Sequence, residues 1–495
     1  MKIVIIGAGL GGLTFGALAS KDGTDVLIID KNKKPGGVVS LFEDGDYKFE
    51  QGPLILGDIL PGEPLAEFLS EFGIKLPTVR ADRGTVAKDY SLWKPEEFKG
   101  YYWRREELKK LFPEDERGID EYYKFYDSLV KIRHLSSKKD VLSKVRLALE
   151  FLKIKKYKDL TAEEFVDKLF KNEKIKIVFT GIIADYCADP KECTCLMIPF
   201  INIETAFDVR SETGISGGFA YFDGGCQKLP KALAEFVISK GGEIRYDTVV
   251  SEVIIENGKA TAVKLENGEI IKADLIVGCG SAKDFFSKTV KREALEATEK
   301  GREYLKIVDG YRAMESVFML HLAVDFDPLD YQPSALCYYY GDYDLSRAIA
   351  DLRSGKYHEG RDGYLVSVPT WHAKDFAPEG QHLMTIYTIA PDVLADGTWE
   401  EKSEVYADKL LALTEEHFPG LRSHILYKKV ITSDYYRDLM HQSKGSFGGA
   451  VPAKDVPLPP HKTPIENLVF VGAQSENGGG ISAVIFGAKA AYENL

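Results

Sequence analysis

The first thirty residues alternate between short apolar runs and glycine-rich or polar breaks. Ile3 to Ile6 is a wholly apolar, β-branched run, which is typical of a central parallel strand buried on both faces. A glycine-rich turn follows at once, and residues 13–20 have the composition of a helix. A second apolar strand is predicted at Val26 to Ile29. This order of strand, turn, helix and strand predicts a parallel α/β unit.

Later parts of the chain space their apolar residues either as helices do or as strands do. Residues 62–170 are predicted to be mostly helical, with periodic apolar positions in 118–130 and 141–152, whereas residues 313–325 and 363–390 alternate as strands do. The last residues predict a strand end at 469–472, a loop at 478–480 and a helix at 481–491. A chain of 495 residues is expected to form two or more domains.

Composition narrows the classes of function. The formal net charge of −12 argues against a general nucleic-acid binder, because phosphate contacts need a basic surface. Six cysteines in so long a chain do not form a disulfide framework, and we interpret the closest cluster, Cys187, Cys193 and Cys195, as free thiols rather than metal ligands. We therefore expect no metal site and a reducing, cytoplasmic location. No apolar run reaches the length of a membrane-spanning helix.

The turn after the first strand carries the chemistry. Gly7, Gly9 and Gly12 have the spacing of the dinucleotide fingerprint, in which glycines allow a tight turn, a close approach of backbone to pyrophosphate and close helix packing. The second strand ends in Asp30, about 20 residues on, where a carboxylate accepts from ribose hydroxyls. Lys31 follows without a basic pocket for a 2′-phosphate, which disfavours NADP.

Further glycine-rich motifs recur in a fixed order: 35–37, 49–53, 224–230, 377–380, 467–473 and 478–484. With the fingerprint, this order resembles the phytoene desaturase-like flavoenzymes, which include carotenoid desaturases, carotenoid isomerases and retinol saturase, within the amine-oxidase-like FAD superfamily. The resemblance runs nearly end to end. It implies FAD as cofactor and an α/β fold: a Rossmann-like FAD-binding domain of the GR2 type, plus a substrate domain of mixed sheet and helical cap.

The resemblance also implies site residues. Gly7, Gly9, Leu10, Gly11 and Gly12 would hold the pyrophosphate, and Asp30, followed by Lys31, the adenosine ribose. The other implied cofactor-binding residues are Gly37, Val38, Gly52, Pro53, Leu54, Val250, Cys279, Gly280, Gly472, Gly480 and Ile481. Val38 departs from the arginine that many superfamily members have there, which favours the isomerase and saturase branches.

The cofactor motifs are far apart in the chain, so the FAD domain is predicted to be discontinuous. We expect it to comprise residues 1–61, 214–290 and 430–495, with residues 62–213 and 291–429 forming the substrate domain. Ligands in such folds lie at the domain interface.

The predicted function is oxidation, reduction or isomerisation at carbon–carbon double bonds of a long isoprenoid, carotenoid-like or related lipid, with hydride transfer at flavin N5. The alternatives are an amine or amino-acid oxidase and, from a different class, a prenyl-binding carrier like the Rab dissociation inhibitors. Tyr338 to Tyr340 and Trp371 are candidate lining residues. No catalytic residue and no redox partner is assigned.

Two local patterns favour a structural interpretation. Gly214 to Gly218 matches the Gly-x-Ser-x-Gly elbow of hydrolases, but a strand rather than a helix is predicted after it, so we reject that interpretation. His321 lies on a predicted strand and is interpreted as a satisfied core histidine.

Residues 142–158 combine an apolar stripe with lysines and an arginine. Such a helix more often packs its stripe on its own protein. The alternative is peripheral contact with an anionic membrane.

Overall fold

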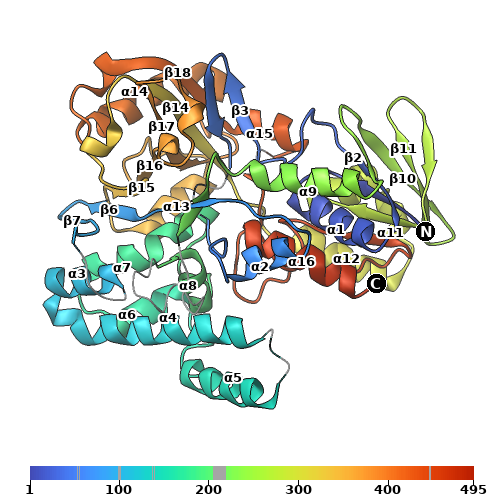
Figure 1. Ribbon diagram of the computed structural model, residues 1–495, viewed down its shortest axis with the longest axis horizontal. Helices are drawn as coiled ribbons and strands as arrows, with labels where there is room; N and C mark the ends of the chain where they lie inside the picture. Colours follow the sequence, from blue (N-terminus) through green and yellow to red (C-terminus); the bar gives the residue numbers. More distant parts are fainter. Residues whose placement is uncertain are drawn as a thin grey trace.

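The structure is a computed structural model that describes residues 1–52, 54, 56–97, 102–136, 138, 140–204, 219–444 and 447–495. Figure 1 shows two sheet-based parts side by side, with a group of helices beneath one of them and both chain ends on the far side of the other. Parallel strands and flanking helices confirm the predicted α/β class.

The first part is built on a five-stranded parallel sheet of order β19-β13-β1-β2-β9. Its strands come from three distant regions: β1 (Lys2–Ile6), β2 (Asp25–Ile29), β9 (Glu243–Arg245), β13 (Leu275–Gly278) and β19 (Leu468–Phe470). The apolar runs predicted at 3–6, 26–29 and 469–472 therefore pair in one sheet, because each can be buried on both faces.

Successive side chains of β1 point to opposite faces of this sheet. Ile3 and Ile5 belong to the core shared with three helices, α1 (Leu10–Lys21), α9 (Lys228–Ser239) and α16 (Ile481–Glu493). Val4 belongs to a second core under the other face. That face is covered by an antiparallel sheet and by helices: β10 (Val250–Glu256), β11 (Lys259–Leu265), β12 (Ile270–Lys272), α10 (Ala282–Asp284), α11 (Arg292–Glu296) and α12 (Glu299–Gly310).

The second part contains a seven-stranded sheet of order β18-β14-β17-β16-β15-β6-β7. Its strands are β6 (Arg83–Ala87), β7 (Tyr90–Leu92), β14 (Ser316–Val324), β15 (Leu336–Tyr340), β16 (Tyr364–Ser367), β17 (His382–Ala390) and β18 (Ile425–Ile431). Helices α13 (Leu345–Arg353), α14 (Trp399–Glu415) and α15 (Ser433–Met440) belong to the same stretch of chain. Two short antiparallel ribbons, β3 (Leu41–Asp44) with β4 (Tyr47–Glu50) and β5 (Thr78–Arg80) with β8 (Ala220–Phe222), complete the strands.

A helical cap lies on this sheet. It comprises α3 (Trp103–Leu111), α4 (Glu116–Ser136), α5 (Val141–Ile154), α6 (Ala162–Leu169), α7 (Glu173–Thr180) and α8 (Ile198–Ile201), with α2 (Pro64–Ser70) nearer the first part. The expectation of a mostly helical segment at 62–170 is wrong for residues 78–92, which form β5, β6 and β7. Strand β6 pairs in parallel with β15, more than 240 residues later in the chain, and this non-local pairing overrides local propensity.

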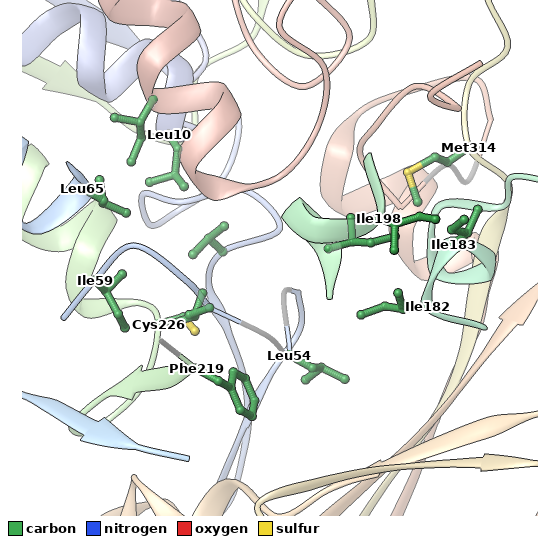
Figure 2. Packing of buried hydrophobic residues seen from close by; sticks show 14 of the residues in the cluster. Leu10, Leu54, Ile59, Leu65, Ile182, Ile183, Ile198, Phe219, Cys226 and Met314 are labelled. Atoms are coloured by element: carbon green, nitrogen blue, oxygen red, sulfur yellow. The ribbon is translucent and has the colours of Figure 1, made fainter. Parts of the chain in front are cut away.

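The predicted division into domains stays a prediction. Core packing gives information on one of its boundaries, the one predicted at residue 290. Residues 299–310 lie beyond the predicted end at 290, yet Tyr304, Leu305 and Val308 of α12 belong to the same core as Val4 and Phe470 of the parallel sheet. Apolar residues also join the two parts. Figure 2 shows Leu10, Leu54, Ile182 and Met314, which come from four distant segments of the chain.

Candidate functional site

A cavity of about 890 Å³ lies where the two parts meet. It opens at the carboxyl ends of the parallel strands: Ile6, Ile29 and Cys279 line it where β1, β2 and β13 end, and Gly472 lines it just after β19. This is the crevice in which open α/β sheets bind their ligands.

Most of the residues implied by the resemblance line this cavity: Gly7, Gly9, Leu10, Gly11, Asp30, Lys31, Gly37, Val38, Gly52, Leu54, Val250, Cys279, Gly280, Gly472, Gly480 and Ile481. Gly12 lies behind the lining, and Pro53 lies outside the described residues. The structure therefore brings together segments that lie more than 470 residues apart in the chain. That these residues hold the cofactor stays a prediction.

Two glycines of the turn have different surroundings. Gly9 is the N-cap of α1, and a Cβ added to it would meet nothing within 4 Å, so its surface is free for a ligand. A Cβ added to Gly12 would lie 2.1 Å from the Gly7 carbonyl oxygen, so only glycine lets the helix pack so closely on the strand end. No side chain caps α1. The N–H groups of its first turn and its positive dipole are thus available to a pyrophosphate.

Asp30 is held rigidly at the end of β2. Its carboxylate accepts a hydrogen bond of 2.6 Å from the Ala8 N–H and one of 2.7 Å from the Asn32 N–H. Burial raises the pKa of Asp30, although both hydrogen bonds oppose that change. Each carboxylate oxygen keeps a further lone pair, so the group can still accept from ribose hydroxyls as predicted.

The C-terminal segment closes the crevice opposite this turn. A Cβ added to Gly11 would lie 3.2 Å from Gly472, so the first turn of α1 and the loop after β19 approach at backbone contact. Helix α16 begins at Ile481 beside the cavity, with Gly480 as its N-cap, and no side chain caps it. Two uncapped helix N-termini therefore face the same space.

The cations that line the cavity already have protein partners. Lys31 donates to the Asp438 carbonyl, Lys288 pairs with Asp284 at 2.9 Å, and Arg437 pairs with Asp392 at 2.7 Å. Val38 stands where many superfamily members have arginine. A bound dinucleotide would therefore depend on helix N-termini and backbone N–H groups for its phosphates. The donor set, the open cradle at Gly9 and the Asp30 carboxylate fit FAD.

Sequence reasoning missed several lining segments. Residues 281–289, 437–442 and 447–449 contribute to the cavity wall, and most of them carry no recognisable motif. One available indication was Gly448-Gly449, because paired glycines outside a strand or helix often mark a close approach of backbone to a ligand.

The other end of the cavity has a different character. Its lining is mainly aliphatic and aromatic, with one carboxyl group: Leu54, Ile182, Asp185, Tyr186, Phe200, Ile201, Ile203, Met314, Tyr338, Leu365, Tyr387 and Phe447. Tyr338 is thus the predicted lining residue that faces this space. Tyr339 points to the opposite side of the sheet, where its hydroxyl donates to Gln332 at 3.0 Å, and neither Tyr340 nor Trp371 lines the cavity.

His321 is a buried core histidine, as predicted, but it is not fully satisfied, because its Nε2 has no hydrogen-bond partner among the described residues. Its ring is buried and stacks on Phe49 with a centroid distance of 4.5 Å, and its Nδ1 lies 3.1 Å from the Thr385 hydroxyl. Burial lowers the pKa of His321 to about 3, so the ring is neutral. It does not line the cavity.

Other expectations concern groups away from the cavity. The cysteines of the described residues are free thiols, and no cluster of three metal-ligating side chains occurs in the part of the chain that the structure describes. The elbow-like stretch at 214–218 lies outside the described residues. Among the helices described, none is long and apolar enough to span a bilayer.

The apolar stripe of α5 is exposed. Leu142 is 60% and Leu152 64% exposed, and Val145 and Leu149 are similarly open to solvent. The expectation that this stripe packs on its own protein is wrong, because α5 packs on α4 through its other side, where Ile154 is buried. Figure 1 shows α5 at the outer edge of the helical cap.

Comparison with known proteins places these features in a wider group. A family model described as flavin containing amine oxidoreductase matches residues 10–493. The chain is 26% identical to the chloroplastic prolycopene isomerase of Daucus carota, over 98% of its own length and 78% of that protein. It is 24% identical to the zeta-carotene-forming phytoene desaturase of Myxococcus xanthus, over 100% of its own length and 93% of that protein. A solved oxidoreductase from Methanosarcina mazei shares the fold, with a TM-score of 0.66 at 20% identity and full coverage of both chains.

Proposed function

The chain belongs to the family of flavin-containing amine oxidoreductases and is an FAD-dependent oxidoreductase, and on that premise we propose that its substrate is a long isoprenoid polyene. The reaction would take place at carbon–carbon bonds of this substrate, as a desaturation, a saturation or an isomerisation. The relatives named above act, by their names, on prolycopene and on phytoene.

The observation that carries this proposal is that the two ends of one cavity have linings of different chemical character. Glycines, backbone N–H groups and Asp30 line the end beside the parallel sheet, and aliphatic and aromatic side chains line the other end. An apolar chain gains from burial there in proportion to its area, about 25 cal/mol per Å².

The residues have separable tasks. When bound, FAD supplies a two-electron acceptor or donor for hydride exchange with a carbon atom. The first turn of α1, Asp30 and the N-terminus of α16 would hold this cofactor. Ile182, Tyr387 and Phe447 would exclude water and hold the polyene in one orientation, since a fixed geometry is what hydride transfer needs. We propose on the same grounds that the predicted domains have separate roles. Residues 1–61, 214–290 and 430–495 would surround the cofactor, and residues 62–213 and 291–429 would surround the substrate.

An amine oxidase would need a charged group at the end of the cavity that is apolar here. A cationic amine is favoured by a charged carboxylate, whereas Asp185 is the one carboxyl among the described residues there and burial raises its pKa to about 7. A prenyl carrier of the Rab dissociation inhibitor type would keep the apolar end without using a flavin. The intact glycine cradle favours the enzyme.

Anaerobic absorption spectroscopy of the purified, FAD-loaded protein tests the proposal. Bleaching of the flavin bands by a partly saturated polyene would indicate desaturation, and reoxidation of prereduced flavin by an unsaturated polyene would indicate saturation. Bleaching by amines alone would contradict the polyene proposal. A protein that binds no flavin would point to the carrier.

We propose further that α5 rests on an anionic membrane surface, from which an apolar substrate could enter. Its exposed stripe lies among Lys144, Arg146 and Lys155, in a protein whose net charge is −12. Some neighbouring cations are neutralised, since Lys156 pairs with Glu121 at 3.0 Å and Lys153 with Glu150 at 2.6 Å. An apolar stripe flanked by cations matches the interfacial helices of peripheral proteins.

A further inference from the structure

Asp185 and Tyr338 form a polar pair in the apolar end of the cavity. Asp185 lies in the short helical turn Gly181–Tyr186 that follows α7, and Tyr338 lies on β15. The Tyr338 hydroxyl donates a hydrogen bond of 2.5 Å to the Asp185 carboxyl. Both residues line the main cavity. The cap and the seven-stranded sheet contribute no other carboxyl to it among the residues that the structure describes.

The same pair also lines a second, smaller cavity of about 40 Å³. Asp185, Tyr338, Leu365 and Tyr387 thus form a wall between the two spaces. A polar cavity holds a water molecule once it exceeds about 10–15 Å³. The smaller cavity therefore has room for water directly behind the carboxyl group.

His358 also lines the smaller cavity. Its side chain is 7% exposed, and the Ile389 backbone approaches the ring, but neither ring nitrogen makes a hydrogen bond of good geometry to a described residue. An imidazole nitrogen that is buried without a well-formed protein hydrogen bond is normally satisfied by ordered water. Asp362 lines the same cavity and pairs at 2.7 Å with Arg347, whose side chain is 44% exposed. Polar groups from Asp362, which pairs with a half-exposed arginine, to Asp185 therefore line one cavity.

The surroundings of Asp185 suit it to proton exchange near neutral pH. Burial raises its pKa to about 7, although the Tyr338 hydrogen bond and the Arg83 charge oppose this. A general acid or base works best when its pKa lies close to the working pH. The titratable groups that interact electrostatically with it are Arg83 on β6, Tyr338 and Tyr340 on β15, Tyr387 on β17, and Tyr186 and Cys187 next to it in the chain.

We propose that Asp185 is the group that exchanges a proton with the substrate, that Tyr338 positions it, and that water in the smaller cavity links it through His358 to the surface. The proposal rests on the proposed function. Forming a C=C bond breaks two C–H bonds. One hydrogen leaves with its electron pair to oxidised FAD, and the other leaves as a proton to the Asp185 carboxylate while its electron pair becomes the second C–C bond. Saturation is the reverse.

Asp185→Asn tests the central step, because it keeps the shape and the hydrogen-bond acceptor for Tyr338 but does not exchange a proton. We expect the rate of flavin bleaching or reoxidation by polyene to fall about 100-fold or more, the usual size of a general acid–base contribution. In the wild type the rate should fall below about pH 7 if Asp185 is the base of a desaturation, and above it if Asp185 is the acid of a saturation.

Tyr338→Phe and Tyr339→Phe form a matched pair on one strand. Tyr338→Phe removes the hydrogen bond to Asp185 and should move the transition in the pH profile, whereas Tyr339→Phe alters the opposite face of the sheet and should leave the profile unchanged. A purely structural role for Tyr338 would lower thermal stability without moving the profile.

Infrared difference spectroscopy of the FAD-loaded protein gives a readout that needs no substrate. A protonated carboxyl band should titrate near neutral pH in the wild type and be absent from Asp185→Asn. Its exchange with D₂O should slow in His358→Gln but not in His417→Gln, a histidine beside Tyr339 on the other side of the sheet.

The outcomes separate the two proposals. A wild type whose flavin does not respond to any polyene, and which with reduced flavin isomerises none, contradicts the proposed function. A responsive wild type with an equally fast Asp185→Asn, or a carboxyl band that persists in that variant, contradicts this inference alone. Unchanged exchange in His358→Gln contradicts the route through the smaller cavity.

Discussion

Gly9 and Gly12 stand in one turn but meet different surroundings. The face of Gly9 is open to the cavity, and that of Gly12 lies against the Gly7 carbonyl oxygen. The fingerprint pattern marks both glycines without distinguishing their tasks. The structure separates them: Gly9 leaves room for the ligand, and Gly12 leaves room for the protein itself.

Substitution by alanine should reveal this difference. Gly9→Ala should leave the melting temperature of the FAD-free protein unchanged but weaken FAD binding by about tenfold or more, because its methyl group enters the space of the cofactor. Gly12→Ala should lower both the melting temperature of the FAD-free protein and its affinity for FAD. We expect overpacking to reduce the free energy of unfolding by about 1–3 kcal/mol. Calorimetry of the FAD-free proteins and FAD titration measure the two effects. Gly310→Ala, at an open position of α12, is the control.

Glu63 should make stability depend on pH. It is buried at the N-cap of α2, accepts a hydrogen bond of 2.8 Å from the Leu60 N–H, and burial raises its pKa from 4.5 to about 8. The folded state then binds the proton more tightly than the unfolded state. Its contribution is complete below about pH 4.5 and is lost as the pH rises toward about 8, with a slope of at most about 1.4 kcal/mol per pH unit.

Melting temperatures across this pH range check the assignment. The decrease should be smaller in Glu63→Gln, because glutamine keeps the hydrogen-bond acceptor but does not titrate. Glu67→Gln changes an exposed residue of the same helix and should follow the wild type. Identical slopes in all three proteins would show that another group controls the stability.

At the scale of elements, local patterns were enough for β1, α1, β2 and α16. Each of these has its apolar period and its glycines within about twenty residues, so the sequence indicates the element and, to within three residues, its ends: α1 begins at Leu10 rather than at the predicted residue 13. Strands β6 and β7 were not predicted, because β6 pairs with β15, which lies more than 240 residues away in the chain, and β7 joins the sheet only through β6. Residues 437–442 were not predicted as cavity lining for a similar reason: Lys31 and Asn32, which are distant in the chain, hold the end of α15 at the site by donating hydrogen bonds to the carbonyl oxygens of Asp438 and Leu439.

The candidate site divides in the same way. Its nucleotide end was predicted because a pyrophosphate needs glycines and a helix N-terminus close together in the chain. Its apolar end was not predicted, because the hydrogen bond that marks Asp185 as a candidate comes from Tyr338, which lies 153 positions away in the chain. Periodicity does not report such a contact.

Helix α5 gives a prediction at the scale of one element. The double substitution Leu142→Glu with Leu149→Glu should reduce binding to phosphatidylglycerol vesicles by about tenfold or more, since it removes apolar burial and adds repulsion from the lipid charge. Co-sedimentation measures this binding. Val405→Glu on α14 changes another exposed apolar residue and should bind as the wild type does. Equal binding of all variants would contradict the proposed membrane contact.

At the scale of the whole molecule, the cofactor crevice joins segments from both ends of the chain. The turn after β1, the loop after β19 and the start of α16 approach one another around it. Asp58 links the same region to the cap, since its carboxylate pairs with Arg133 of α4 and accepts a hydrogen bond of 2.8 Å from Ser482 of α16. Cofactor binding should therefore stabilise distant segments together.

Removal of FAD tests this coupling. Binding to the folded state alone adds about 2.7 kcal/mol at a ligand concentration of 100 times Kd. We expect the melting temperature to fall when FAD is removed, and amide hydrogen exchange to rise together in residues 7–12 and 472–484. Exchange in α14, which lies in a separate core, should not change. Faster exchange confined to one of the two segments would contradict the coupling.

The central claim is that one cavity between the two sheets holds FAD at its glycine-lined end and a polyene at its apolar end. The most direct measurement is the electron density of the FAD-loaded protein crystallised with a polyene under anaerobic conditions. The account predicts the dinucleotide between β1 and the start of α16, and continuous polyene density beside Ile182, Tyr338 and Tyr387. A polyene bound elsewhere, or a cofactor outside this crevice, would contradict it.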